Sequence, residues 1–175
     1  RIDGSGRLLL GTTTEGEATL DDLTIATSGD TGMTIRSGTS SNGAIGFSDG
    51  TSGADEYRGL IDYDHNGNYF RFYTDAEERV RINSDGQILI GHTASLGHSG
   101  VDGYLQVTGT GTDDSSITQS RFSADAWGPF ITMGKSRNAT IGGNTVVQDG
   151  DYLGYINFAG NDGTDFNNPA AYIAA

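Results

Sequence analysis

Short apolar runs separated by clusters of glycine, aspartate, asparagine and serine are the feature that most limits what this chain can form. The clearest series lies at residues 59–91, where apolar and polar side chains alternate and the turn sequences 65–68 and 83–86 interrupt the alternation. Alternation is the period of a β-strand, and Asn-Gly is a strong hairpin signal. We therefore predict a four-stranded antiparallel meander here, with Phe70 and Phe72 on one face and Arg71 on the other.

The remaining apolar runs predict further short strands and no long helix. The runs that resemble strands are residues 33–36, 44–47, 105–107, 130–133 and 155–158. Residues 74–78 can hold one helical turn at most. Gly, Thr, Asp, Ser and Asn make up 91 of the 175 residues, and these types favour turns and strand edges over helix interiors. The predicted fold class is all-β, built from short antiparallel strands and hairpins.

Internal similarity predicts a tandem arrangement. Residues 1–13 match residues 81–93 position for position at an offset of 80, and residues 23–25 then correspond to 105–107. Residues 59–63 correspond to 154–158. We predict a first β repeat unit at residues 1–80 and a second at 81–175, with the meander 59–91 bridging the two. Arrays of this kind form shafts in which each repeat contacts its neighbours.

The apolar content is too small for a stable single chain. Ile, Leu, Phe and Val together number 35, spread over 175 residues. Folding costs roughly 1–2 kcal/mol of backbone entropy per residue, whereas burial returns roughly 1.5–3 kcal/mol per large side chain. Short strands also leave unpaired edges, and the chain has one Lys and two Pro with which to protect them. We therefore predict a homo-oligomer without a stable monomer.

Charge and residue usage exclude several classes of function. The net charge is −13, which argues against nucleic acid and against anionic membrane surfaces as partners. The chain has no cysteine, so it can form no disulfide and no thiolate zinc site. No apolar run approaches the roughly 20 residues of a membrane-spanning helix.

Several stretches carry a resemblance to a known family. Residues 78–91, ERVRINSDGQILIG, resemble the ERMRI…S.G.V.IGT repeat of tail fibres and tailspikes of tailed bacteriophages. Residues 59–65 and 70–74 resemble the segment that precedes this repeat in those proteins. Residues 128–130, 134–137 and 148–163 are similar to another fibre module, common in marine phage sequences. The resemblance covers most of the chain in patches.

The resemblance implies an intertwined homotrimeric fibre shaft on a virion. Its role is then structural: the chain supports or takes part in host-cell attachment, with other virion tail proteins as partners and a host surface glycan as a further candidate. Such fibres often end in a self-cleaving chaperone domain. Because the chain begins at Arg1 and Ala175 falls in a strand-like pattern, we expect a fragment, with that domain beyond Ala175 or removed. Two alternatives stay open, an extracellular bacterial filament or adhesin module and a carbohydrate-degrading tailspike enzyme.

Two motifs imitate catalytic or nucleotide-binding sequences. Residues 46–50 fit G-x-S-x-G around Ser48, but the nucleophile elbow needs a following helix, and loop residues follow here. Residues 128–136 end in Gly-Lys-Ser at Lys135, but five residues rather than four separate the glycines, and no helix is predicted next. We predict no enzyme activity, no catalytic residue and no cofactor.

Acidic and aromatic side chains supply the remaining candidates. Residues 62–68 imitate the opening of a calcium loop, with Asp62, Asp64 and Asn66 as weak ligand candidates. The two aspartates share a strand face, so their repulsion can attract a cation, although a solvated hairpin face is the favoured interpretation. Loop acids at 113–114 and 149–151 are weaker candidates still. Trp127, Tyr69 and Tyr73 are weak candidates for glycan contact, against the simpler interpretation of packing within or between chains.

Overall fold

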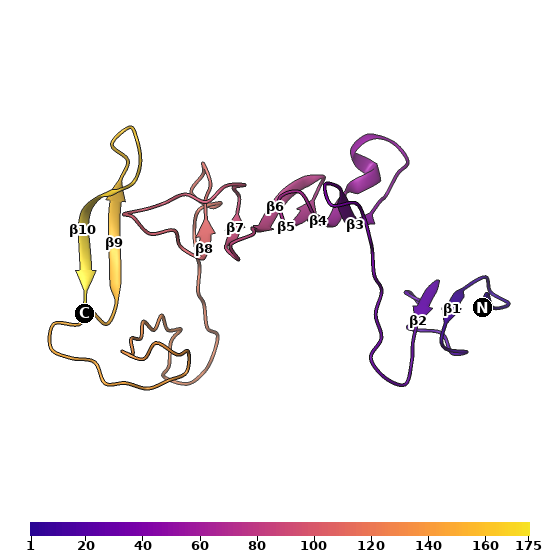
Figure 1. Cartoon of the computed structure of the whole chain (residues 1–175), viewed down its shortest axis with the longest axis horizontal. Helices are drawn as coiled ribbons and strands as arrows, with labels where there is room; N and C mark the ends of the chain where they lie inside the picture. Colours follow the sequence, from indigo (N-terminus) through magenta and orange to yellow (C-terminus); the bar gives the residue numbers. More distant parts are fainter. The chain divides into compact units, whose positions relative to one another are not determined.

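A computed structural model describes all residues, 1–175. The chain divides into two compact units, Arg1–Gly38 and Thr39–Ala175 (Figure 1). The regular structure is β, apart from one five-residue 3₁₀ turn, η1 (Gly53–Tyr57). No helix is long and apolar enough to cross a bilayer. The all-β prediction is therefore confirmed.

The strands are short and form three separate sheets. A six-stranded sheet contains β3 to β8 in sequence order, β1 pairs only with β2, and β9 pairs only with β10. The strands are β1 (Leu8–Leu10), β2 (Leu23–Ile25), β3 (Asn42–Phe47), β4 (Gly59–Asp64), β5 (Tyr69–Thr74), β6 (Glu77–Ile82), β7 (Ile88–Ile90), β8 (Leu105–Val107), β9 (Tyr155–Gly160) and β10 (Asn168–Ala174).

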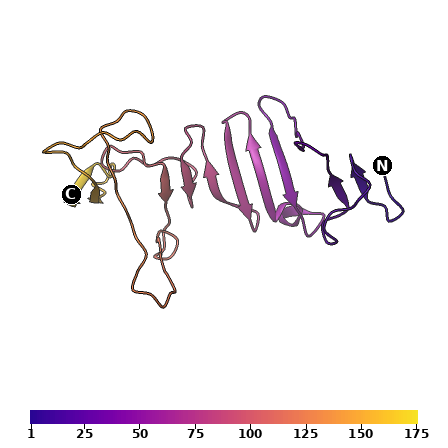
Figure 2. The same ribbon diagram turned by 90° about the horizontal axis from the view of Figure 1, so that it is seen from below.

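The six-stranded sheet contains the predicted meander. Strands β4, β5, β6 and β7 pair antiparallel with their neighbours over residues 59–90, and β3 adds an antiparallel edge strand (Figure 2). Strand β8 pairs with β7 in parallel at the other edge, as β2 pairs with β1. The prediction of antiparallel pairing thus misses these two parallel pairs, which longer connections allow.

Local turn chemistry explains the meander. Asp64 accepts hydrogen bonds from the backbone N–H groups of Asn66 and Gly67 and so closes the first turn. The β5–β6 turn places Asp75 at φ 54° and Ala76 at φ 60°. Positive φ at both central residues suits the twist of a hairpin. Residues 74–78 therefore form a hairpin turn and strand ends and contain no helical turn, which agrees with the predicted limit of one turn at most.

The β1–β2 and β7–β8 pairs make the same local contacts. Asp3 Oδ1 accepts from two backbone N–H groups of its turn, and Asn83 Oδ1 does the same in the second turn. Gly11 and Gly91 both have φ +77°, and an added Cβ would lie 2.3 Å from Ala26 O and 2.2 Å from Thr108 O, respectively. Each position therefore requires glycine, because the neighbouring strand's backbone leaves no room for a side chain.

Other predictions differ from the structure. Residues 33–36 and 130–133 are irregular rather than strands, because no segment of the chain pairs with them. Residues 44–47, 105–107 and 155–158 do lie in strands. The compact units divide after Gly38, whereas position 80 falls inside β6. The repeat units 1–80 and 81–175 describe sequence similarity and stay a prediction.

The buried core is very small. Leu9 and Leu89, which correspond in the two matching stretches, are each 1% exposed and are the only fully buried hydrophobic side chains. Many other large apolar side chains are exposed.

Candidate functional site

A buried polar cluster lies on one face of the β3–β8 sheet, around Asp62. This carboxylate is 2% exposed and accepts hydrogen bonds from Arg71 Nε (2.7 Å) and Arg71 Nη2 (2.5 Å). Asn42 Nδ2 lies 3.4 Å from the same oxygen. The pairing register sets Asp62 directly opposite Arg71 in the neighbouring strand. A buried carboxylate thus has its countercharge within the same chain.

Asp64 lies on the same face of β4 and is held by its own turn. It accepts from Asn66 N (2.8 Å), Gly67 N (2.9 Å) and the Tyr69 hydroxyl (2.9 Å). The Gly67 N–H, more than the other donors, lowers the pKa of Asp64 from its usual value. The predicted sharing of one strand face is correct, and Arg71 Nη2, 3.9 Å from Asp64, places a positive charge close to both carboxylates.

The metal prediction is not strengthened by this geometry. The oxygens of Asp62 and Asp64 face an arginine, amide groups and a hydroxyl, while Asn66 is an exposed turn residue. No three histidine, aspartate or glutamate side chains are grouped as a metal site. Calcium at Asp62, Asp64 and Asn66 stays a prediction.

Tyr69 and Tyr73 flank Arg71 on the face of the sheet that carries Asp62. The guanidinium carbon of Arg71 lies 5.3 Å from the Tyr69 ring centroid and 5.7 Å from that of Tyr73. Arg81 lies 4.1 Å from the Tyr69 centroid and pairs with Glu78 at 2.7 Å. Both tyrosines therefore pack against cations of their own chain. The sequence analysis did not single out Arg81 and Glu78, because their partners follow only from the strand register.

Trp127 lies apart from these tyrosines, in the strandless stretch of residues 108–154. It is 69% exposed, and its ring centroid is 5.9 Å from that of Phe130. The three candidate glycan-contact residues thus do not form one platform, and their role in glycan contact stays a prediction.

Ser48 lies in a bend after β3. Its hydroxyl donates to Gly50 O (2.6 Å) and can also reach Asp55 O (2.9 Å). The following element is the short η1 turn rather than an α-helix. These contacts are those of a loop-closing serine.

Lys135 lies in an irregular, exposed segment. The hydroxyl of the adjacent Ser136 can donate to the carbonyl oxygen of Gly143 or of Thr145, and it accepts from the N–H of Thr145. No helix N-terminus follows to receive a phosphate, so the physical basis of a phosphate loop is absent.

Two of the loop acids, Asp114 and Asp151, are bonded within the chain. Asp114 accepts from the backbone N–H groups of Thr110 and Gly111. Asp151 receives two hydrogen bonds from Arg137, both at 2.7 Å, and this arginine above all lowers the pKa of Asp151 to about 2.

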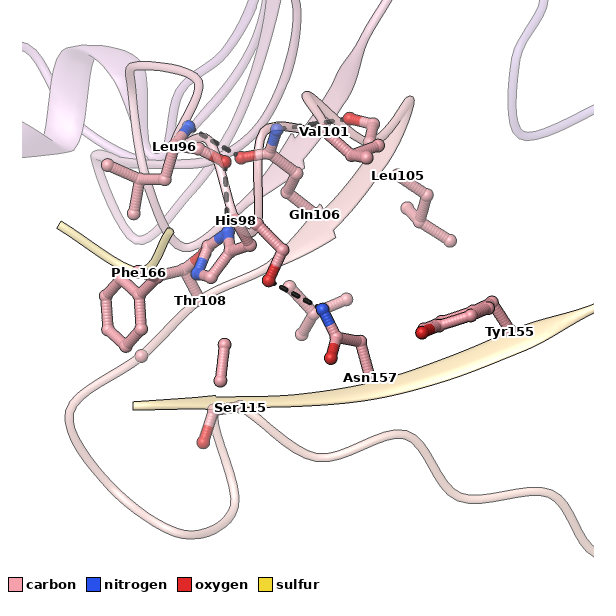
Figure 3. Close-up of a pocket in the computed structure, with 15 residues that line it drawn as sticks. Leu96, His98, Val101, Leu105, Gln106, Thr108, Ser115, Tyr155, Asn157 and Phe166 are labelled. Atoms are coloured by element: carbon pink, nitrogen blue, oxygen red, sulfur yellow. Dashed lines mark hydrogen bonds between the residues drawn. The ribbon is translucent and has the colours of Figure 1, made fainter. Parts of the chain in front are cut away.

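A cavity of about 840 Å³ lies between the loop that precedes β8 and strand β9 (Figure 3). His98 and Phe166 stack with centroids 4.6 Å apart, and Asn157 Nδ2 donates to Ser99 Oγ at 2.6 Å. Gln106 Oε1 accepts from Leu96 N at 2.9 Å. Because these polar groups bond within the chain, they stabilise the cavity wall.

Exposed apolar side chains are the most extensive feature of the surface. They occur in both compact units and on every strand except β6. More than half of the apolar positions of β3, β9 and β10 are exposed, for example Phe47, Phe158 and Tyr172. No protein-family model, curated protein or solved structure matches this chain.

Proposed function

We propose that this chain is a structural segment of a homo-oligomeric fibre, the shaft of a viral tail fibre or tailspike, which supports host-cell attachment. The observation that carries the proposal is the exposure of the apolar side chains. Only Leu9 and Leu89 are fully buried among the hydrophobic residues. A chain with so small a core gains too little from burial to offset its conformational entropy alone.

The surface area supports the same conclusion. The exposed surface is 13188 Å² for 18.3 kDa, whereas a folded monomer of this mass exposes about 8,100 Å² by the usual scaling. The excess, roughly 5,000 Å², is larger than the 1,200–2,000 Å² that a typical stable interface buries. Association of several copies is therefore the simplest way to cover it.

The viral assignment rests on the resemblance to tail-fibre modules of residues 59–65, 70–74, 78–91, 128–130, 134–137 and 148–163. That resemblance is also the reason for choosing a trimer and for naming other virion tail proteins as partners. The matched contacts of the β1–β2 and β7–β8 pairs support the tandem repeat. A non-viral extracellular filament would use the same association and differ only in where the fibre is found.

The enzyme alternative has less support. A glycosidase needs two carboxyl groups that face a common cleft. Asp62 and Asp64 share a face but are bonded to Arg71 and to turn amides. A sugar-release assay separates the structural role from the enzyme, because a tailspike enzyme would release sugar from host-surface polysaccharide.

Immunogold electron microscopy tests the location. Antibodies against this chain should label tail fibres on phage particles. Labelling of capsid-free filaments on a bacterial surface would contradict the viral assignment and favour the filament. Sugar release by the purified chain would contradict the purely structural role.

A further inference from the structure

One face of the β3–β8 sheet carries two continuous rows of uncharged side chains. Residues directly opposite each other in paired strands lie on the same face, so the register identifies each row. We call the two rows together the apolar face. The first row is Ile45, Ile61, Phe72, Val80, Ile90 and Val107; the second is Gly43, Tyr63, Phe70, Ile82, Ile88 and Leu105.

The opposite face of the same strands is polar and complete within one chain. Asp62, Arg71 and Arg81 are direct cross-strand neighbours there. Asp62 pairs with Arg71 and Arg81 pairs with Glu78, so the charges are neutralised locally. This face thus buries a carboxylate, whereas on the apolar face Phe72 stays 38% exposed and Leu105 58% exposed. A stable monomer shows the reverse distribution.

The first compact unit repeats this arrangement. In the β1–β2 pair, Leu8 lies opposite Leu23 and Leu10 lies opposite Ile25, and Leu8, Leu10 and Leu23 are exposed. Leu9 between them points to the other side and is fully buried, as Leu89 is between Ile88 and Ile90. The β1–β2 pair of the first unit therefore carries a smaller surface that is equivalent to the apolar face.

We propose that the apolar face is the surface through which copies of this chain associate, each copy covering the apolar face of another. The inference rests on the proposed oligomeric function and adds where the contact lies. Each copy carries a net charge of −13, which opposes close approach. The two rows contain no charged residue, so copies can meet there without burying unpaired charge.

The geometry of the rows favours a second copy as the occupant. Neighbouring strands lie about 4.8 Å apart, so each row presents side chains at that spacing. An identical row has the same spacing, and its aliphatic and aromatic side chains can fit between those of the first. Large apolar interfaces with few charges are typical of obligate homo-oligomers. The excess exposed surface is sufficient for such a contact.

Charge insertion tests the proposal with a matched control. Phe72→Asp places a carboxylate in the first row, and Phe122→Asp makes the same change at a side chain that is 98% exposed in the strandless stretch. Light scattering at micromolar concentration should show Phe72→Asp reduced to an 18.3 kDa species, whether folded or unfolded, while Phe122→Asp keeps the oligomer. An unchanged oligomer in Phe72→Asp overturns the inference.

Thiol reactivity gives a second measurement that does not depend on that variant. The chain has no cysteine, so Ile61→Cys and Phe122→Cys each introduce a single probe. In the oligomer, alkylation of Ile61→Cys should be at least about tenfold slower than that of Phe122→Cys, and the two rates should converge in denaturant. Equal rates in an intact oligomer overturn the inference and leave the proposed function standing. A folded wild-type monomer contradicts the proposed function itself.

Discussion

The β3–β8 sheet and the stretch of residues 108–154 have comparable apolar side chains but different structures. In the sheet, each of the runs in residues 42–107 pairs with a neighbour, mostly across a tight turn. Residues 108–154 contain no strand, and Phe122 and Ile141 are almost wholly exposed. The side-chain hydrogen bonds within residues 108–154 are mostly local, such as those between Arg121 and Asp125.

The difference shows what a β-strand of this composition requires. Strands β5 and β6 pair readily because only Asp75 and Ala76 separate them, and both of these residues have positive φ. The run at residues 130–133 has the same strand-like character but no hairpin turn beside it. Pairing across a tight turn has a low loop-closure cost, whereas a run without one needs a distant partner.

The largest expected effect concerns the buried ion pair of the sheet. Arg71→Leu leaves the Asp62 carboxylate buried without its cation, which typically costs about 3–5 kcal/mol of unfolding free energy. Arg137→Leu removes the more exposed pair with Asp151 and should cost much less than Arg71→Leu, because solvent screens the exposed pair. Urea unfolding followed by circular dichroism measures both, and equal losses would contradict the contrast between the regions.

A double variant separates charge from side-chain size in the same experiment. Asp62→Leu combined with Arg71→Leu removes both charges, and replacing a buried ion pair with apolar groups is often close to neutral. The double variant should therefore recover most of the stability that Arg71→Leu loses. If it is as unstable as the single variant, the loss does not come from the unpaired carboxylate.

The next effect concerns the backbone at the parallel strand pair. Gly91→Ala adds a Cβ 2.2 Å from Thr108 O at φ +77°, so we expect a loss of about 2–4 kcal/mol through clash and backbone strain. Gly134→Ala lies in the strandless stretch with no atom within 4 Å, and it should be neutral or slightly stabilising. Thermal unfolding of the two variants compares them, and a tolerated Gly91→Ala would mean that β7–β8 is not packed as described.

The pKa values of carboxyl groups are lowered in both regions, but by different groups. Arg121 above all lowers the pKa of Asp125 to about 2, and Arg137 does the same for Asp151, whereas turn amides lower the pKa of Asp64. A depressed folded-state pKa contributes stability that is present above the ordinary value near 3.8 and is lost as the pH falls toward about 2. Both regions should therefore weaken as the pH falls below about 3.8.

Salt separates the two causes in a carboxyl NMR titration. Concentrated sodium chloride should raise the midpoints of Asp125 and Asp151 more than that of Asp64, because exposed ion pairs are screened and turn hydrogen bonds are not. Equal shifts at all three positions would show that the arginines are not the main cause in residues 108–154.

The smallest effect concerns divalent cations. We expect calcium and magnesium to raise the melting temperature modestly and equally at matched ionic strength, since they screen a net charge of −13. A much larger effect of calcium would reveal a specific site. Asp62→Asn and Asp64→Asn would then locate it.

Much of the fold follows from local sequence signals, and the rest depends on pairing. The meander and the opposite faces of Phe70 and Arg71 could be predicted because alternation and tight turns act over a few residues. The bond between Asp62 and Arg71 could not, because it requires the strand register. Residues 33–36 and 130–133 have strand-like composition, which by itself does not supply a partner.

The most direct test of the account is the concentration dependence of folding and mass measured together. Light scattering and circular dichroism on a dilution series should show an oligomer, a trimer of about 55 kDa from three chains of 18.3 kDa, whose melting temperature rises with concentration. On dilution, β-structure and mass should fall together. A cooperatively folded 18.3 kDa species with a concentration-independent melting temperature would contradict the account, whereas a stable dimer would contradict only the trimer.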